Sequence, residues 1–203
     1  YENTLGLILP ILNGAGVTYL RKPPTASVLV PAMQSVKPDF MLTVPMIIEK
    51  VFKNSVLPQI KKKATTRAMY NNKLTRKLVY RIAGKKLYKT FGGNLKFFGI
   101  GGAKLDAQVE EFLRDGKFPY AIGYGLTETA PMLAGSNPSM TKYQAIGPKV
   151  IECELKLDNP DPKTGEGEVW AKGPNIMMGY YKNEEKTKEV LTDDGWFKTG
   201  DLG

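Results

Sequence analysis

Two short apolar segments of this chain run directly into glycine-rich turns, and this pair of features restricts the fold most strongly. Residues 95–100 lead into residues 101–103 (Gly-Gly-Ala), and residues 117–122 lead into residues 123–125 (Gly-Tyr-Gly). Apolar runs of this length between turn signals are typical of buried strands. Ligands of open α/β sheets bind beyond the carboxyl ends of such strands. We therefore expect the two turns to lie side by side at a binding crevice.

The other segments up to residue 145 alternate between helical and extended patterns, which predicts a parallel α/β sheet. Pro45 suits the first turn of a helix, and Asp106 suits the capping position of another. The expected elements are a helix over 1–12, a short strand over 17–20, a helix over 25–36, a buried strand over 40–44, a helix from Pro45 to about residue 52 and a helix over 106–114.

The pattern changes in the last third of the chain. Residues 152–157 and 167–172 alternate between apolar and polar positions, and the residues between them are typical of a hairpin loop. Such a pair indicates antiparallel β structure rather than more of the parallel sheet. We therefore predict an α/β subdomain over residues 1–145, followed by a β-rich subdomain over residues 146–203 with a small antiparallel, barrel-like sheet.

The composition excludes several kinds of chemistry. The 203 residues contain one cysteine, Cys153, and no histidine. A disulfide within the chain is therefore impossible, and the single thiol fits a reducing compartment. Histidine-based triads, histidine general bases and most zinc sites are excluded as well. No apolar run reaches the roughly 18 residues of a membrane-spanning helix, so we expect a cytoplasmic protein.

Positive charge is concentrated in one segment, residues 50–89. Thirteen lysine and arginine residues lie in it, with no acidic residue among them. Apolar residues recur in the same segment near helical spacing and indicate one or two amphipathic helices: Tyr70, Leu74, Leu78, Tyr80, Ile82 and Leu87. One interpretation is an ordinary solvated helical face; the other is peripheral contact of residues 54–90 with the inner, anionic face of a membrane. No RNA- or DNA-reading motif is present, so we expect no nucleic-acid partner.

Residues 123–129 (Gly-Tyr-Gly-Leu-Thr-Glu-Thr) combine several ligand-binding groups. The glycines permit close approach of the backbone, and Tyr124 offers a flat face on which a base can stack. Thr127 can donate a hydrogen bond to a phosphoryl oxygen, and Glu128 can bind a hard cation such as Mg2+. The same residues also fit an ordinary turn, in which Thr127 caps a helix and Glu128 lies in its first turn. The seven residues alone leave both interpretations open.

Three successive motifs resemble core motifs of the adenylate-forming superfamily, which includes acyl-CoA synthetases, luciferases and peptide-synthetase adenylation domains. They are residues 124–128 (Tyr-Gly-Leu-Thr-Glu), the glycine-containing segment 167–181, and residues 196–201 (Trp-Phe-Lys-Thr-Gly-Asp). Residues 1–6 and 37–50 resemble the long-chain fatty acid–CoA ligase branch most closely. The resemblance spans nearly the whole chain, and the order and spacing of the motifs make it specific.

This resemblance implies a two-step reaction and a set of site residues. A fatty acid carboxylate attacks the α-phosphate of Mg-ATP, and coenzyme A then displaces AMP from the acyl-adenylate. The implied catalytic residues are Thr127, which hydrogen-bonds the α-phosphate, and Glu128, which binds Mg2+. Tyr124 would stack on adenine, and Asp201 would accept hydrogen bonds from the ribose. The full set of implied nucleotide-binding residues is Gly101, Gly102, Ala103, Tyr124, Gly125, Thr127 and Asp201.

The resemblance also implies parts that this chain does not contain. A glycine- and hydroxyl-rich phosphate loop is expected before Tyr1, and a mobile domain with a catalytic lysine after Gly203. We therefore predict that the chain by itself has no ligase activity. The alternatives are another adenylating ligase, acting on a short or aromatic acid, and a non-catalytic nucleotide-binding module. The residues expected to be structural rather than ligand-binding are Gly167, Glu168, Trp170, Gly173, Gly179 and Trp196.

Overall fold

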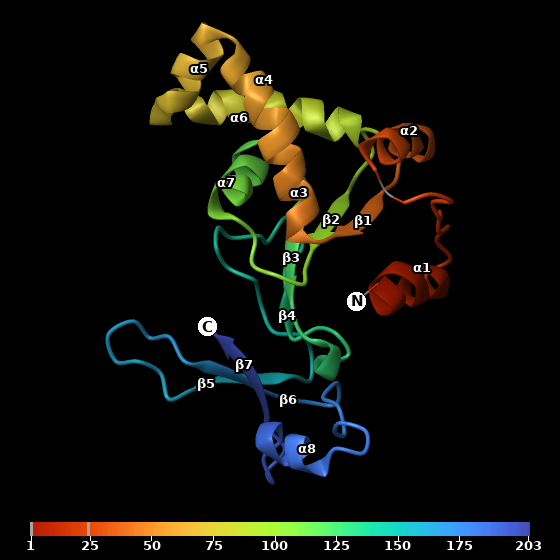
Figure 1. The fold of residues 1–203 in the computed structure, drawn as a ribbon, viewed down its shortest axis with the longest axis vertical. Coiled ribbons are helices and arrows are strands. Elements are labelled where there is room, and N and C mark those ends of the chain that lie inside the picture. Colours follow the sequence, from red (N-terminus) through yellow and green to blue (C-terminus); the bar gives the residue numbers. More distant parts are fainter. Residues whose placement is uncertain (1, 24) are drawn as a thin grey trace.

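The computed structural model describes residues 2–23 and 25–203 (Figure 1). Its helices are η1 (Glu2–Ile8), α1 (Leu9–Leu12), α2 (Ala26–Val36), α3 (Pro45–Val51), η2 (Phe52–Val56), α4 (Leu57–Lys62), α5 (Ala64–Asn71), α6 (Lys73–Thr90), α7 (Ala107–Asp115), η3 (Thr127–Thr129) and α8 (Glu184–Val190). Its strands are β1 (Phe40–Thr43), β2 (Phe97–Ile100), β3 (Tyr120–Tyr124), β4 (Ala134–Gly135), β5 (Glu154–Asp158), β6 (Glu168–Lys172) and β7 (Phe197–Leu202).

The first sheet has the strand order β1–β2–β3–β4. β1 pairs with β2, and β2 with β3, in parallel, whereas β4 is antiparallel to β3. Phe98 lies opposite Tyr120 and Ile100 opposite Ile122, so β2 and β3 end at the same edge of the sheet. The expected α/β fold is therefore confirmed, and the two glycine-rich turns follow neighbouring strands.

Aromatic side chains fill the space between this sheet and its helices. Phe52 of η2 packs against Phe112 of α7 with ring centroids 4.9 Å apart, and Tyr80 of α6 packs edge-on against Phe112 at 5.4 Å. All three rings are fully buried. Phe98 of β2 meets Phe118 in the same way at 5.2 Å. These contacts join α6 and α7 to the same buried core as the sheet.

The strands β5, β6 and β7 form a separate antiparallel sheet. In Figure 1 this sheet lies at the opposite end of the molecule from α4, α5 and α6. The sheet is open rather than barrel-like, because in the described part of the chain β5 and β7 each pair with β6 and not with one another. The strand β7 was not expected from the sequence. The division of the chain into subdomains near residue 145 stays a prediction.

The strand expected over residues 17–20 is absent. This stretch is irregular, and the side chain of Tyr19 is 70% exposed. An extended segment needs a neighbouring strand or a core to cover it. Residues 17–20 have neither within the described chain, so the local β preference of Val17 and Tyr19 is not realised.

The basic segment contains the end of α3 followed by η2, α4, α5 and α6, rather than one or two helices. Asn72 separates α5 from α6, and its side chain accepts a hydrogen bond from the Leu74 N–H at 2.9 Å. Only part of the expected apolar stripe is buried. Tyr70, Tyr80 and Leu87 are buried, whereas Leu74, Leu78 and Ile82 are exposed. Within residues 2–23 and 25–203, no helix combines the length and the apolar character needed to cross a bilayer.

Candidate nucleotide-binding site

The turn after β2 can offer backbone, but few side-chain groups, to a ligand. The Gly101 N–H donates to the Thr43 carbonyl oxygen of β1 at 3.2 Å, which continues the sheet by one bond. Gly102 has a φ of 91°, a conformation that residues with a side chain rarely adopt. Gly102 and Ala103 are exposed, whereas Gly101 is buried. The turn is therefore placed at the edge where β2 and β3 both end.

The loop after β3 folds back tightly on itself. The Leu133 N–H donates to the Tyr124 carbonyl oxygen at 2.9 Å, and β4 then pairs with β3. Gly125 passes so close to Pro131 that a Cβ atom would collide with the Pro131 carbonyl oxygen. Glycine is thus required at position 125 by the return path of the chain. A direct contact of Gly125 with a nucleotide stays a prediction.

The two threonines of this loop have different environments. Thr129 is fully buried, and its Oγ1 accepts a hydrogen bond from the Leu126 N–H at 2.9 Å. Thr127 is exposed, and its hydroxyl has no partner among the described residues. The capping position that the ordinary-turn interpretation gives to Thr127 is occupied by Leu126, whose N–H is bound by the Thr129 side chain. The Thr127 hydroxyl is left available to a ligand.

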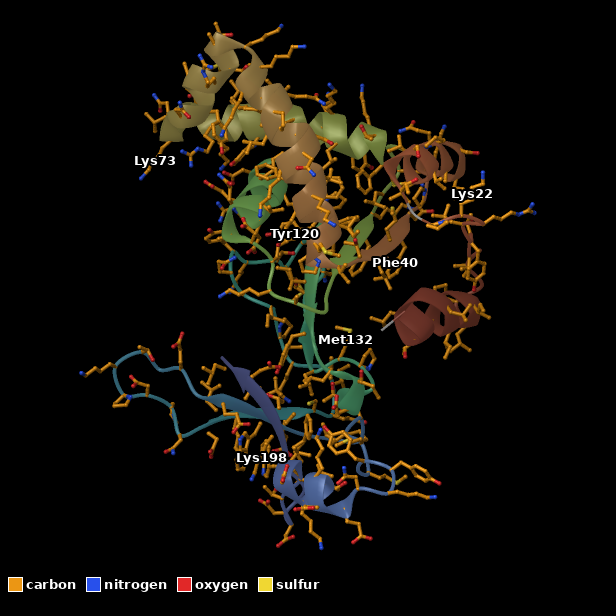
Figure 2. All side chains as sticks on the ribbon, in the orientation of Figure 1. Lys22, Phe40, Lys73, Tyr120, Met132 and Lys198 are labelled. Carbon is orange, nitrogen blue, oxygen red and sulfur yellow. The ribbon has the colours of Figure 1, made fainter. Side chains whose placement is uncertain are left out.

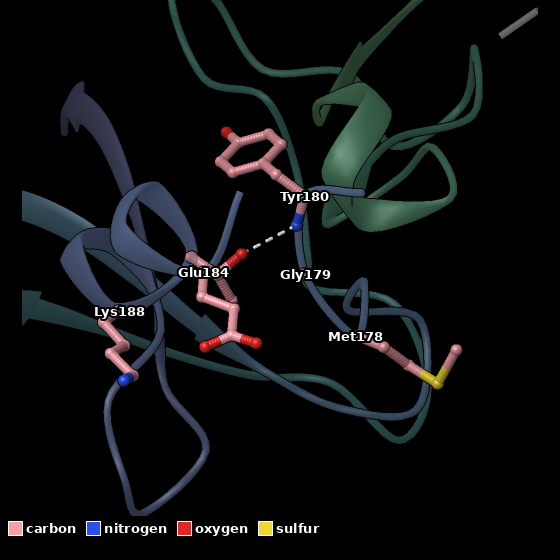
Figure 3. A pocket seen from close by; sticks show the side chains of 6 residues that line it. Met178, Gly179, Tyr180, Glu184 and Lys188 are labelled. Carbon is pink, nitrogen blue, oxygen red and sulfur yellow. Dashed lines mark hydrogen bonds between the residues drawn. The ribbon is translucent and has the colours of Figure 1, made fainter. Parts of the chain in front are cut away.

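Glu128 is held by residues that follow β6. The Tyr180 hydroxyl donates to Glu128 Oε1 at 2.9 Å, and the Met177 N–H donates to the Glu128 carbonyl oxygen at 2.8 Å. The Glu128 carboxylate raises the pKa of Tyr180, because it accepts a bond from the protonated phenol. Tyr180 also lines a shallow hollow of about 300 Å³. There the Tyr180 N–H donates to Thr187 Oγ1 at 2.9 Å (Figure 3). The second carboxylate oxygen, Glu128 Oε2, has no partner within the described chain.

Asn175 ties the same loop to the second sheet. Its Nδ2 donates to the Thr129 carbonyl oxygen at 3.0 Å and to the Met132 carbonyl oxygen at 2.8 Å. Both acceptors flank the point where the loop turns back toward β4. A single amide group thus fixes the loop from both sides, which limits the freedom of Thr127 and Glu128.

Tyr124 and Asp201 meet across the two sheets. The Tyr124 hydroxyl donates to Asp201 Oδ2 at 2.8 Å, although the residues are 77 positions apart. Burial raises the pKa of Tyr124 to about 12, and the bond to Asp201 acts in the same direction. Asp201 is exposed, and its Oδ1 has no partner among the described residues. The pair therefore presents a tyrosine ring beside a carboxylate with a free acceptor oxygen.

Glu168 supports the turn that carries Asp201. Glu168 Oε1 accepts from the Gly200 N–H at 3.0 Å, and Glu168 Oε2 accepts from the Trp170 indole N–H at 3.0 Å. The register between β6 and β7 shifts between Glu168 and Trp170, so β7 is irregular where Gly200 and Asp201 lie. Such irregularities re-aim side chains at sheet edges. The carboxylate of Glu168 thus stabilises the geometry that directs Asp201 toward Tyr124.

The structure gathers Tyr124, Thr127 and Glu128 on one loop and joins Asp201 to it, with residues 101–103 at the neighbouring strand end. The roles assigned to these residues stay predictions. No cluster of three or more histidine, cysteine, aspartate or glutamate side chains suits a metal ion in the described chain. A Mg2+ ion at Glu128 would take its other ligands from phosphate and water, which is the usual arrangement for this ion.

Sequence reasoning missed the residues that hold the loop. Asn175 and Tyr180 bind residues 46 and 52 positions away, and local patterns carry no information about such pairs. Glu168 was expected to be structural, but its bond to Gly200 was not foreseen. The sequence feature that could have pointed to Glu168, Asn175 and Tyr180 is their position within the glycine-containing segment 167–181.

Comparisons with solved structures agree with this architecture. MatB from Rhodopseudomonas palustris, in its apo form, matches with a TM-score of 0.70 and 22% identity, over 98% of this chain and 34% of that protein. The o-succinylbenzoate CoA synthetase of Bacillus subtilis, in complex with AMP, matches with a TM-score of 0.67 and 19% identity, over 98% of this chain and 35% of that protein. At these identities the likeness establishes the fold.

Sequence comparisons establish the family. Long-chain-fatty-acid–CoA ligase 1 of Saccharomyces cerevisiae is 34% identical over 189 residues, which are 84% of this chain and 27% of that enzyme. Fatty acyl-CoA synthetase A of Dictyostelium discoideum is 40% identical over 124 residues, which are 55% of this chain and 18% of that enzyme. The chain thus spans less than a third of the length of these relatives. Residues 1–181 match the AMP-binding enzyme family, and the chain therefore belongs to that family.

Proposed function

We propose that this chain supplies the nucleotide-binding part of a long-chain fatty acid–CoA ligase. The observation that carries the proposal is the 2.8 Å hydrogen bond between Tyr124 and Asp201. An adenine can stack on the tyrosine ring while the ribose hydroxyls donate to the free oxygen of Asp201. Membership of the AMP-binding family and the similarity to long-chain ligases support the proposal.

In the proposed reaction, a carboxylate oxygen of the fatty acid attacks the α-phosphorus of ATP and pyrophosphate leaves. The thiol of coenzyme A then attacks the acyl carbon and AMP leaves. Negative charge develops on the α-phosphate in the first step, and the free hydroxyl of Thr127 is suited to donate a hydrogen bond to it. Glu128, held by Tyr180, would bind Mg2+, whose charge offsets that of the phosphates.

The nucleotide part of the proposal is tested by titrating the chain with AMP in a calorimeter. Asp201→Ala and Thr127→Val are each expected to weaken AMP binding roughly ten-fold, because each removes a protein group that would form a hydrogen bond with the nucleotide. Asp193→Ala and Thr65→Val are the matched controls, since both residues are exposed and their side chains have no partner among the described residues. Unchanged affinity in Asp201→Ala would contradict the assigned ribose contact.

The substrate class is tested with stable acyl-adenylate analogues, in which a sulfamoyl group replaces the phosphate. A long-chain ligase binds the palmitoyl analogue more tightly than the acetyl or benzoyl analogue. Tighter binding of the acetyl or benzoyl analogue supports the alternative, a ligase for short or aromatic acids. Equal affinity for AMP and all three analogues supports a nucleotide-binding module without an acyl site.

A second proposal concerns the outer face of α6, which carries an apolar stripe that nothing in the described chain covers. Leu74 is 90% exposed, Leu78 51% and Ile82 65%. A basic residue directly precedes each of them: Lys73, Lys77 and Arg81. Figure 2 shows nitrogen-tipped side chains projecting around α4, α5 and α6, with Lys73 at the outer end of α6. Apolar side chains flanked by cations suit peripheral contact with an anionic membrane.

The membrane contact is tested by co-sedimentation with phosphatidylcholine vesicles, with and without phosphatidylserine. Binding is expected to require phosphatidylserine. It is expected to fall roughly ten-fold or more when Leu74, Leu78 and Ile82 are all replaced by glutamine, because that change removes the apolar area that the membrane would cover. The control replaces Ile151 and Met178, which are exposed but lie outside the basic segment. Equal loss in both variants would argue against a specific face.

A further inference from the structure

The two carboxylate oxygens of Glu128 have different environments. Oε1 accepts a hydrogen bond from the Tyr180 hydroxyl at 2.9 Å, whereas Oε2 has no partner within residues 2–23 and 25–203. The Met177 N–H holds the backbone of the same residue through the Glu128 carbonyl oxygen at 2.8 Å. Glu128 therefore offers a ligand one free oxygen and one that is already occupied.

Tyr180 is in turn fixed by α8. The Tyr180 N–H donates to Thr187 Oγ1 at 2.9 Å, and the Thr187 hydroxyl donates to the Asn183 carbonyl oxygen at 2.8 Å. A Cβ atom at Gly179 would lie 2.7 Å from Thr187 Cγ2, so α8 packs directly against this segment. Lys186 Nζ, on the same helix, lies 5.2 Å from the centroid of the Tyr180 ring. These contacts restrict the ring and keep its hydroxyl directed at the carboxylate.

Divalent cations differ in how they use a carboxylate. Mg2+ requires short bonds and near-ideal octahedral geometry, and it keeps several of its waters. Ca2+ accepts more oxygen ligands in a flexible geometry, and it can take both oxygens of one carboxylate. A carboxylate with one oxygen already bound to a phenol therefore suits Mg2+ and is a poorer ligand for Ca2+.

We propose that Tyr180 is a positioning residue that makes the cation site at Glu128 selective for Mg2+ over Ca2+, because it leaves Oε2 alone to the cation. This inference rests on the proposed function, in which Glu128 binds the Mg2+ of Mg-ATP. Among the described residues, no cluster of three or more histidine, cysteine, aspartate or glutamate side chains is suited to a metal ion. The number of oxygens that Glu128 offers is therefore the main way in which these residues can discriminate between cations.

The test is a calorimetric titration of the 203-residue chain with ATP, in Mg2+ or in Ca2+ at concentrations that saturate the nucleotide. The native chain is expected to bind Mg-ATP more tightly than Ca-ATP. Tyr180→Phe keeps the ring and frees Oε1, so the ratio of the Mg-ATP affinity to the Ca-ATP affinity is expected to fall at least roughly three-fold. Tyr181→Phe makes the same change on the neighbouring tyrosine, which is 88% exposed, and is expected to leave the ratio unchanged. An equal fall in both variants would overturn the proposal.

The affinity ratio separates selectivity from a merely structural role. If the Tyr180 hydroxyl only held the loop in place, Tyr180→Phe would weaken both complexes alike, and an unchanged ratio would overturn the proposal. Glu128→Gln is expected to bring the two affinities together. A preference for Mg-ATP that persists in Glu128→Gln would come from elsewhere and would also overturn the proposal.

A second pair of variants keeps the test decisive even if Tyr180→Phe fails to fold. Thr187→Val removes the acceptor of the Tyr180 N–H and is expected to lower the ratio, whereas Thr187→Ser keeps the hydroxyl and is expected to preserve it. Circular dichroism shows which variants are folded. Equal ratios in the two folded Thr187 variants would contradict the placement of Tyr180 through α8.

AMP separates this inference from the proposed function. AMP affinity is expected to be the same in Tyr180→Phe and in the native chain, because the proposed adenine and ribose contacts belong to Tyr124 and Asp201. AMP binding together with an unchanged cation ratio in Tyr180→Phe would refute the selectivity alone. A native chain that binds no AMP would refute the nucleotide role, and this inference with it.

Discussion

The Tyr124 hydroxyl and the Asp201 carboxylate are joined by a 2.8 Å hydrogen bond that links the parallel sheet to the antiparallel one. Tyr124 ends β3, and Asp201 lies near the end of β7. The bond sets the tyrosine ring and a free carboxylate oxygen side by side, so a base and a ribose could be bound together. The relative position of the two sheets is therefore part of the proposed site.

The first prediction concerns the titration of Tyr124. Burial, aided by the Asp201 carboxylate, raises the pKa of Tyr124 to about 12 from the usual 10.0. Between these two values the folded chain keeps a proton that the unfolded chain releases. The stabilising contribution of Tyr124 is therefore complete below about pH 10 and is lost as the pH rises through about 12.

This titration is measured from tyrosinate absorbance as the difference between the native chain and Tyr124→Phe. Asp201→Asn is expected to lower the midpoint only partly, because burial is the larger cause. A difference band that titrates at the usual tyrosine value would contradict the buried, hydrogen-bonded state of Tyr124.

The second prediction compares two threonines that are two residues apart. Thr129→Val removes the acceptor of the Leu126 N–H inside a buried turn, so it is expected to lower the free energy of unfolding by about 1–3 kcal/mol. Thr127→Val changes an exposed hydroxyl without a partner in the described chain, so its free energy of unfolding should change by less than about 0.5 kcal/mol. Urea unfolding measures both, and a larger loss in Thr127→Val would contradict the assignment of Thr129 as the residue that holds the turn.

The sequence predicted the strands that carry the site but not the long-range hydrogen bond that joins Asp201 to Tyr124. Residues 95–100 and 117–122 are apolar runs bounded by glycine turns, and local patterns of this kind suffice to indicate strands β2 and β3. The parallel pairing followed from the alternation of helix and strand. Asp201 was placed near the nucleotide through a family resemblance, and its bond to Tyr124 became visible only in the folded chain.

Tertiary context explains the remaining differences. Residues 17–20 have β-forming side chains but nothing to pair with, so local preference did not decide their structure. The apolar residues of α6 follow one helical spacing, yet Tyr80 is buried and Leu74 is 90% exposed. Spacing identifies the faces of a helix, and only the neighbouring elements determine how far along its length a face is covered.

The third prediction concerns Glu168, which we assign as a positioning residue. Glu168→Gln offers one acceptor oxygen in place of two, so the Gly200 N–H or the Trp170 indole loses its partner. AMP affinity is expected to fall roughly five-fold through misplacement of Asp201, and the fluorescence of Trp170 should change. Glu166→Gln is the matched control, because that side chain is exposed and has no partner in the described residues. Weaker AMP binding without a fluorescence change would argue against action through the β7 turn.

The last prediction concerns a buried carboxylate of α7 that holds the loop leading away from β4. Glu110 is fully buried, and its Oε1 accepts from the Tyr120 hydroxyl at 3.2 Å and from the Gln144 N–H at 3.0 Å. Glu110→Ala leaves these donors without an acceptor, so a loss of about 3 kcal/mol in the free energy of unfolding is expected. Its neighbour Glu111 is partly exposed and pairs with Arg76 at 3.8 Å, and Glu111→Ala should cost less than about 1 kcal/mol. Urea unfolding of the two variants measures the difference, and equal losses would mean that the buried hydrogen bonds of Glu110 contribute no more than a surface ion pair.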